Sequence, residues 1–355
     1  AMMACKASIK AGDPISMEEM KTLIERLKTC ENPFNCAHGR PTIIHYPKYE
    51  LDKLFKRAVY GGVMIIVIAG PTGVGKTKLS IELAKKYNAE IINADSVQVY
   101  KKIDIASAKV TEEEKEGIPH HLFDIKEYDE DYTVYDYQID ARRALNNLLK
   151  ENKNVIIVGG TGLYIKALLY DYRFNKEEDS HKYDNLTNAE LLDKIYKINP
   201  NSMVDKNNNR RLIRELINLE NGAENKAGDN LLYNNVYFIG LTVDRSILYD
   251  RINKRVDIML KSGLEDEAKY FYNKNRDAKS LRTVIGYKEL FLYFDKKISK
   301  EEAIDLIKKN SRHYAKRQYT WFNNKLNLNW FNVDFNNFDN TINDVENKIN
   351  DYFFK

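Results

Sequence analysis

The residues best suited to chemistry lie in one short stretch, where an apolar run over 64–69 leads into the spacing G-x-x-x-x-G-K-[ST]. An apolar, β-branched run of this length is typical of a buried strand, and the glycines after it let backbone N–H groups converge on a phosphate. The N-terminus of the following helix adds positive charge, Lys76 adds a point charge, and Thr77 is placed to bind Mg²⁺. The spacing predicts a phosphate-binding loop (P-loop) formed by Gly70, Pro71, Thr72, Gly73, Val74, Gly75, Lys76 and Thr77.

Two further motifs follow predicted strands. A strand over 90–94 ends in Asp95, within the run Asp-Ser-Val-Gln-Val-Tyr, and a strand over 154–158 ends in the run Gly-Gly-Thr-Gly-Leu-Tyr at 159–164. Open α/β sheets bind their ligands beyond the carboxyl ends of the strands. We therefore expect Asp95 and Thr161 to lie beside the P-loop.

These motifs, together with Lys-Arg-Gln-Tyr-Thr-Trp at 316–321, resemble the signatures of the tRNA dimethylallyltransferases (tRNA isopentenyltransferases). The resemblance runs from about Met64 to at least Phe331. It implies that the dimethylallyl group of dimethylallyl diphosphate is transferred to N6 of adenosine 37 in tRNA, beside the anticodon, with release of diphosphate and with Mg²⁺ as cofactor. Two interpretations compete with this one. The first is a P-loop kinase of a nucleotide or small metabolite, and the second is a non-catalytic scaffold associated with DNA repair.

The resemblance also implies roles for single residues. Asp95 would be the general base that accepts a proton from the exocyclic amine, and its alternative role is that of a Mg²⁺ ligand. Lys76, Thr161 and Arg255 would contact the diphosphate, and the alternative for Arg255 is a salt bridge on a helix surface. The predicted catalytic residues are Asp95, Thr161, Arg255 and Lys76.

Contacts to the anticodon stem-loop are predicted on four stretches of the chain. Basic residues would bind phosphates, while Ser96 and Gln98 would recognise the edges of a flipped-out base. Aromatic Tyr287 and Trp321 either stack on bases or pack in the core, and Val97 lines either a channel or the core. The predicted tRNA-binding residues are Asp95, Ser96, Val97, Gln98, Arg210, Arg211, Arg214, Arg282, Gly286, Tyr287, Lys316, Arg317, Gln318 and Trp321. For His120 and His121 we expect structural hydrogen bonds rather than acid–base roles.

The order of strands and helices predicts an α/β fold, namely a P-loop NTPase-like parallel sheet with helices on both faces. Residues 63–172 form the first part of this core, 173–232 a helical insertion domain that contacts tRNA, and 233–355 the completion of the core and the C-terminal helices. The predicted strands are 64–69, 90–94, 154–158 and 236–241. The predicted helices are 76–87, 134–151, 162–169, 188–198, 209–219 and 245–261, then a run of helices to about 322 and a last helix over 342–353.

Residues 1–62 differ from the rest of the chain. They contain a predicted helix over 16–27, begun by a capping box of Ser16 and Glu19, and a Cys-Ala-His-Gly-Arg-Pro motif at 36–41. This part resembles the C-terminal end of MutL-type mismatch-repair proteins, which implies that Cys5, Cys36 and His38 are vestigial Zn²⁺ ligands. We interpret 1–62 as a MutL-like remnant and linker, and the alternative is a functional appended module.

Composition sets the remaining limits. The 355 residues are 43% hydrophobic and 30% charged, which suffices for two or more domains. No apolar run approaches the ~18 residues that cross a bilayer, and no signal peptide opens the chain. The three cysteines all precede residue 40. These features predict a cytoplasmic protein with no membrane contact, and we expect a monomer.

Overall fold

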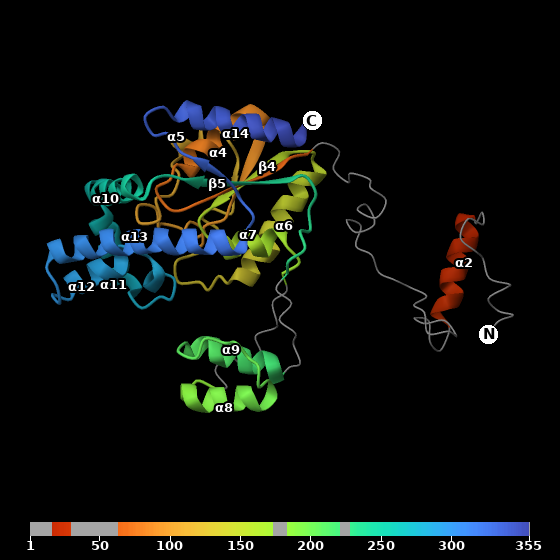
Figure 1. Ribbon diagram of the computed structural model, residues 1–355, viewed down its shortest axis with the longest axis horizontal. Helices are drawn as coiled ribbons and strands as arrows, with labels where there is room; N and C mark the ends of the chain where they lie inside the picture. The colour runs from red at the N-terminus through yellow and green to blue at the C-terminus, as the bar shows by residue number, and fades with distance from the viewer. Residues whose placement is uncertain (1–15, 30–62, 173–182, 221–227, 355) are drawn as a thin grey trace. The chain divides into compact units, whose positions relative to one another are not determined.

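The computed structural model describes residues 16–29, 63–172, 183–220 and 228–354 (Figure 1). The chain divides into two units, Ala1–Val59 and Tyr60–Lys355. In the first unit the structure describes helix α2 (Met17–Lys28). Its capping box is confirmed, since the Glu19 backbone N–H donates to Ser16 Oγ at 3.2 Å and the Ser16 N–H donates to the Glu19 carboxylate at 2.8 Å. Cys5, Cys36 and His38 lie outside the described residues, so the zinc site stays a prediction.

The second unit is built on a six-stranded parallel sheet in the order β3-β2-β4-β1-β5-β6. The prediction of a parallel α/β sheet is confirmed, but the sequence did not reveal the short edge strands β3 and β6. The strands are β1 (Ile65–Ala69), β2 (Ala89–Asn93), β3 (His120–His121), β4 (Asn154–Gly159), β5 (Val236–Thr242) and β6 (Asn329–Asn332).

Strand β1 is buried on both faces because its alternate residues enter two different cores. Ile66 and Ile68 pack with α4 (Lys76–Tyr87) and α14 (Phe338–Phe353), whereas Ile65 and Val67 pack with α6 (Val134–Lys150) and α7 (Gly162–Leu169). Figure 1 shows α4 and α14 on one side of the sheet and α6 and α7 on the other. Helices on both faces, as predicted, leave only the strand ends free to form a site.

The C-terminal helices share a third core with the segment that follows β2. Val99 and Ile103 of that segment pack against Phe271, Tyr287 and Leu290. These helices are α10 (Arg245–Lys261), α11 (Leu264–Asn275), α12 (Tyr287–Phe294) and α13 (Lys300–Lys325), with a 3₁₀ turn η1 (Leu281–Thr283). The short helix α5 (Glu112–Lys115) lies between β2 and β3. Residues after β2 are thus held between the sheet and the C-terminal helices.

The predicted helical insertion contains α8 (Asn188–Ile198) and α9 (Asn209–Glu220), which pack on each other around Leu191, Ile195 and Leu216. The Thr187 side chain caps α8 and belongs to a capping box with Glu190. In the part of the chain that the structure describes, no helix is both long enough and apolar enough to span a membrane.

Candidate active site

A cavity of about 710 Å³ lies at the carboxyl ends of the neighbouring strands β2, β4 and β1. The P-loop, the two other strand-end motifs and the four C-terminal helices α10, α11, α12 and α13 all contribute to its wall. Side chains and glycines that line it include Thr72, Gly73, Lys76, Thr77, Asp95, Ser96, Gln98, Gly160, Arg251, Arg255, Tyr314 and Gln318. Motifs that are far apart in the sequence therefore meet in one space.

The P-loop has the geometry that its spacing predicts. Gly75 precedes α4 with φ of 99°, and a Cβ atom there would lie 2.9 Å from the ring of Phe338. Only glycine tolerates both the left-handed backbone and this close approach. Thr77 follows on the first turn of α4 and is exposed.

Lys76 carries a positive charge that the free site stabilises poorly. Its ammonium donates a hydrogen bond to the Pro71 carbonyl oxygen at 2.8 Å. Burial and the guanidinium of Arg255 lower the pKa of Lys76 to about 8, although the charge of Asp95 acts in the opposite direction. A lysine pKa lowered this far inside a cavity is typical of a functional group that binds a charged ligand.

Two arginines of α10 extend this positive region. Arg255 donates to the Thr72 hydroxyl at 3.1 Å, and burial lowers the pKa of its guanidinium. Arg251 donates to the Gly73 carbonyl at 3.2 Å and stacks on Phe335, 3.5 Å from the ring centroid. Of the two interpretations of Arg255, the geometry favours the one in the cavity over the surface salt bridge. Sequence reasoning missed Arg251, although its place one helical turn before Arg255 was a usable signal.

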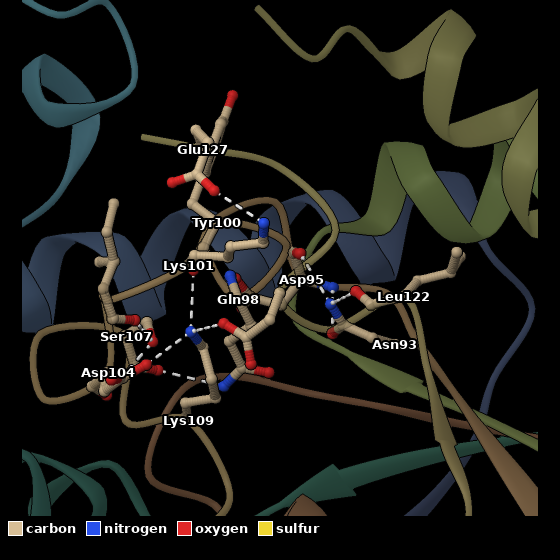
Figure 2. Close-up of polar contacts among 12 residues, drawn as sticks. Asn93, Asp95, Gln98, Tyr100, Lys101, Asp104, Ser107, Lys109, Leu122 and Glu127 are labelled. Atoms are coloured by element: carbon tan, nitrogen blue, oxygen red, sulfur yellow. Dashed lines mark hydrogen bonds and ion pairs between the residues drawn. The ribbon is translucent and has the colours of Figure 1, made fainter. Parts of the chain in front are cut away.

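Asp95 is held on the cavity wall by its own backbone turn. Its Oδ1 accepts a hydrogen bond from the Val97 N–H at 2.9 Å, and its N–H donates to Asn93 Oδ1 at 2.9 Å. The Asn93 amide in turn donates to the Leu122 carbonyl at 3.0 Å (Figure 2). These bonds orient the carboxylate at the end of β2, beside Lys76 and Arg255, to whose charges it is coupled.

Gln318 of α13 connects two of the motifs. Its Oε1 accepts from the Thr72 N–H at 2.9 Å and its Nε2 donates to the Gly160 carbonyl at 3.0 Å. A Cβ atom on Gly160 would lie 2.2 Å from that Nε2, and one on Gly162 would lie 2.1 Å from the ring of Trp321. The Gly-Gly-Thr-Gly run and the late Gln-x-x-Trp run therefore fit each other. The buried Gln318 amide joins cavity walls, a placement that the sequence did not predict.

Thr161 follows the cavity-lining Gly160 after the end of β4 but is not itself among the residues that line the cavity. Its hydroxyl oxygen accepts from the Ser96 N–H at 3.1 Å. Burial and the charge of Asp95 raise the pKa of the Tyr314 hydroxyl. Tyr314 lines the cavity and was not among the predicted residues. Its place one helical turn before Gln318 on α13 was a usable signal.

The remaining predicted tRNA-binding residues fall into four groups. Gln98 lines the cavity, as do Ser96 and Val97. The basic side chains on the surface are Arg210, Arg211, Arg214, Arg282, Lys316 and Arg317. Gly286 and Tyr287 are buried, and the Tyr287 hydroxyl donates to Glu267 at 2.6 Å, so the geometry favours packing over base stacking for Tyr287. Trp321 packs on Gly162 and also borders a second hollow along α13 with Lys316 and Arg317.

Both histidines of β3 make the structural hydrogen bonds that we expected. His120 Nδ1 lies 2.8 Å from the Ile118 carbonyl, and burial lowers the pKa of its ring. His121 Nε2 lies 2.8 Å from the Glu90 carboxylate. His121 thus joins two neighbouring strands of the sheet.

Comparison with known proteins identifies one family. Residues 98–325 match the IPP transferase family. A tRNA dimethylallyltransferase of Anoxybacillus flavithermus is 44% identical over 305 residues, covering 82% of this chain and 98% of the relative. One from Bacillus cytotoxicus is 46% identical over 286 residues, covering 76% and 90%.

Solved structures agree as well. The full-length tRNA isopentenylpyrophosphate transferase of Bacillus halodurans superposes with a TM-score of 0.62 at 42% identity, over 82% of this chain and 96% of that one. Crystallographic snapshots of a eukaryotic dimethylallyltransferase acting on tRNA give a TM-score of 0.69 at 30% identity, over 80% and 77%. The chain therefore belongs to the IPP transferase family, and the kinase and scaffold interpretations are rejected.

Proposed function

We propose that this protein transfers the dimethylallyl group of dimethylallyl diphosphate to N6 of adenosine 37 in tRNA and releases diphosphate. The observation that carries the proposal is one cavity in which a P-loop with three cationic side chains faces a carboxylate at a strand end. The names of the relatives support the same reaction. The P-loop side, with its cations, is called the donor half below, and the side formed by residues 95–98 and 106–108 is called the acceptor half.

In the donor half, the charge of the departing diphosphate must be neutralised. Lys76, Arg251 and Arg255 surround the P-loop, and the desolvated charges of Lys76 and Arg255 act more strongly on an anion than they would in water. Thr161, at the end of β4, would donate a hydrogen bond from its hydroxyl to the leaving diphosphate. Binding of the diphosphate would relieve the repulsion between Lys76 and Arg255.

In the acceptor half, the exocyclic amine of adenine is a weak nucleophile because its lone pair is delocalised into the ring. Asp95 would accept the proton that N6 loses as the new C–N bond forms. The Nε2 group of Gln98 is already bonded to loop carbonyls, so its Oε1 is the atom left to accept from N6–H. A base stacked in a loop cannot reach this depth, so adenosine 37 must be flipped out.

The oxygen donors of the cavity fit Mg²⁺. The exposed Thr77 hydroxyl lies one residue after Lys76, and the Asp95 carboxylate lies on the same cavity wall. Mg²⁺ prefers such oxygen ligands and usually keeps several waters while binding substrate phosphates. Thr77 would hold the ion, which would supply charge neutralisation at the diphosphate. Exposed basic residues of α9 and α13, among them Arg210, Arg214 and Lys316, would contact tRNA phosphates.

The test is transfer of radiolabelled dimethylallyl diphosphate to unmodified tRNA by the full chain in the presence of Mg²⁺. We expect label on wild-type transcripts and none on a transcript with adenosine 37 changed to guanosine. Label that does not depend on adenosine 37, or turnover of ATP without any transfer to tRNA, would overturn the proposal.

A further inference from the structure

Glu267 of α11 has no part in the reaction described above, yet its carboxylate accepts four hydrogen bonds. Three come from consecutive backbone N–H groups, those of Asp104, Ile105 and Ala106, at 3.0, 2.7 and 2.9 Å. The fourth comes from the Tyr287 hydroxyl of α12, at 2.6 Å. A carboxylate has about four acceptor positions, so these four hydrogen bonds use the full acceptor capacity of Glu267.

The segment it holds, 104–109, is called the cavity loop here. The loop closes on itself, because the Lys109 N–H donates to the Asp104 carbonyl at 2.9 Å. At its far end the Lys109 ammonium is nearly buried and donates to the Tyr100 carbonyl at 2.8 Å and to Asp104 and Asp124 at 2.6 Å each (Figure 2). A carboxylate thus holds the start of the loop and an ammonium holds its end.

The middle of the cavity loop forms part of the acceptor half. Ala106, Ser107 and Ala108 line the cavity. The carbonyl oxygens of Ser107 and Ala108 accept from Gln98 Nε2 at 3.1 and 3.3 Å. The Gln98 N–H in turn lies 3.4 Å from Asp95 Oδ1. A continuous set of contacts therefore leads from Glu267 through the loop to the side chains that would face adenine.

We propose that Glu267 is a positioning residue for the acceptor half of the cavity, and this inference rests on the proposed function. Glutamine in its place keeps one oxygen and presents an NH₂ group where the other oxygen was. At least one of the three loop N–H groups then loses its acceptor, and the loop moves, taking the Gln98 amide with it. The donor half has its own supports in α10 and Gln318, so it stays in place. Loss of Glu267 consequently impairs the use of tRNA while leaving the use of dimethylallyl diphosphate intact.

The experiment compares Glu267→Gln with wild type in steady-state transfer, varying each substrate while the other is saturating. Misplacement of a reacting group by about 1 Å can cost on the order of a hundredfold, so we expect kcat/KM for tRNA to fall between about tenfold and a hundredfold. The KM for dimethylallyl diphosphate should stay within about twofold of wild type. The matched control is Glu265→Gln on the same helix, which removes only the ion pair with Lys300 and should leave both parameters unchanged.

A double variant separates positioning from a general loss of structure. If Glu267 acts through Gln98, then Glu267→Gln combined with Gln98→Ala should lose little more activity than Gln98→Ala alone. Additive losses, or equal losses for both substrates, would overturn the inference. Should Glu267→Gln fail to fold, Tyr287→Phe removes one of the four donors and should show the same selective loss at a smaller size; kinetics equal to wild type would then overturn it.

Wild type also serves to distinguish the two proposals. If the wild-type chain transfers label and Glu267→Gln does so equally well, the inference alone fails. If wild type transfers none, the proposed function fails and the inference with it.

Discussion

The donor and acceptor halves of the cavity are built in different ways. The donor half is centred on eight consecutive residues, 70–77, to which α10 adds two arginines one helical turn apart. The acceptor half depends on side chains that hold distant backbone, as when Glu267 binds N–H groups more than 160 positions earlier in the chain. The phosphate-binding backbone and the charge of Lys76 are thus encoded locally. The two arginines, 178 and 183 positions away from their P-loop partners, and the position of the base depend on the completed fold.

The halves also differ in how well their polar groups are satisfied. In the donor half, burial lowers the pKa of Lys76 to about 8 and also lowers the pKa of Arg255, so the free site carries unfavourable charge. In the acceptor half, Lys109 and Glu267 are surrounded by partners. We infer that the donor half gains stability from its ligand, and that the acceptor half is already ordered before tRNA arrives.

The largest effect should come from Asp95→Asn. The variant keeps an oxygen for the Val97 N–H but removes the proton acceptor, so kcat should fall by about 10²- to 10⁴-fold while the affinities for tRNA and diphosphate change little. The measurement is single-turnover transfer with both substrates saturating. A loss that excess Mg²⁺ restores would instead assign Asp95 to the metal.

Lys76→Ala should impair the donor half of the cavity. One charged donor to a developing anion typically contributes on the order of 10²- to 10³-fold, and we expect a loss of that size in kcat/KM for dimethylallyl diphosphate. Binding of tRNA, followed by fluorescence anisotropy, should stay within about twofold of wild type, because Lys76 lies in the donor half. Lys85→Ala, which removes an exposed charge from the same helix, is the control and should behave as wild type.

The difference between the two halves also explains how much of the fold and of the site could be predicted from the sequence. The P-loop, the strand ends at Asp95 and Gly159, and the helix over 162–169 were all predicted, because each depends on neighbours in sequence. Strand β6 was missed because its four residues, Asn-Trp-Phe-Asn, show no alternation of apolar and polar side chains. It forms only because β5 offers it an unpaired edge.

At the site, too, contacts between residues far apart in the chain could not be predicted from the sequence. Gln318 was predicted to contact tRNA, but its amide joins Thr72 to Gly160, 246 and 158 positions away. Nothing near Gln318 in the sequence indicates such partners. Glu267 was missed for the same reason, whereas Arg251 and Tyr314 could have been found from their helical spacing to Arg255 and Gln318.

The pH dependence of diphosphate binding should sharpen the difference between the halves. A bound anion raises the pKa of Lys76 above its value of about 8 in the free protein. Binding is therefore strongest when the pH is below about 8 and weakens as the pH rises from there towards the pKa in the complex. Within that window, the ratio of wild-type to Lys76→Met affinity should fall by about tenfold per pH unit. Calorimetry of inorganic diphosphate checks this, and a ratio independent of pH would contradict it.

Arg251→Ala should give the smallest effect of the four. Arg251 is exposed and reaches the P-loop through one hydrogen bond to the Gly73 carbonyl and its stacking on Phe335. An exposed charge of this kind contributes about 1 kcal/mol, so affinity for diphosphate should fall about fivefold with kcat for saturated substrates unchanged.

The control for Arg251→Ala is Arg245→Ala, on the same helix but away from the cavity, where the guanidinium stacks on Tyr249. If both variants bind diphosphate equally well, Arg251 belongs to the surface and the donor half has two cations rather than three. If only Arg251→Ala weakens binding, α10 supplies two cations of different exposure, with the half-buried Arg255 closer to the reacting atoms and the exposed Arg251 at the entrance. The donor half would then include both arginines of α10 as well as the P-loop, and the second arginine could be predicted from the first because residues four apart lie on the same face of a helix.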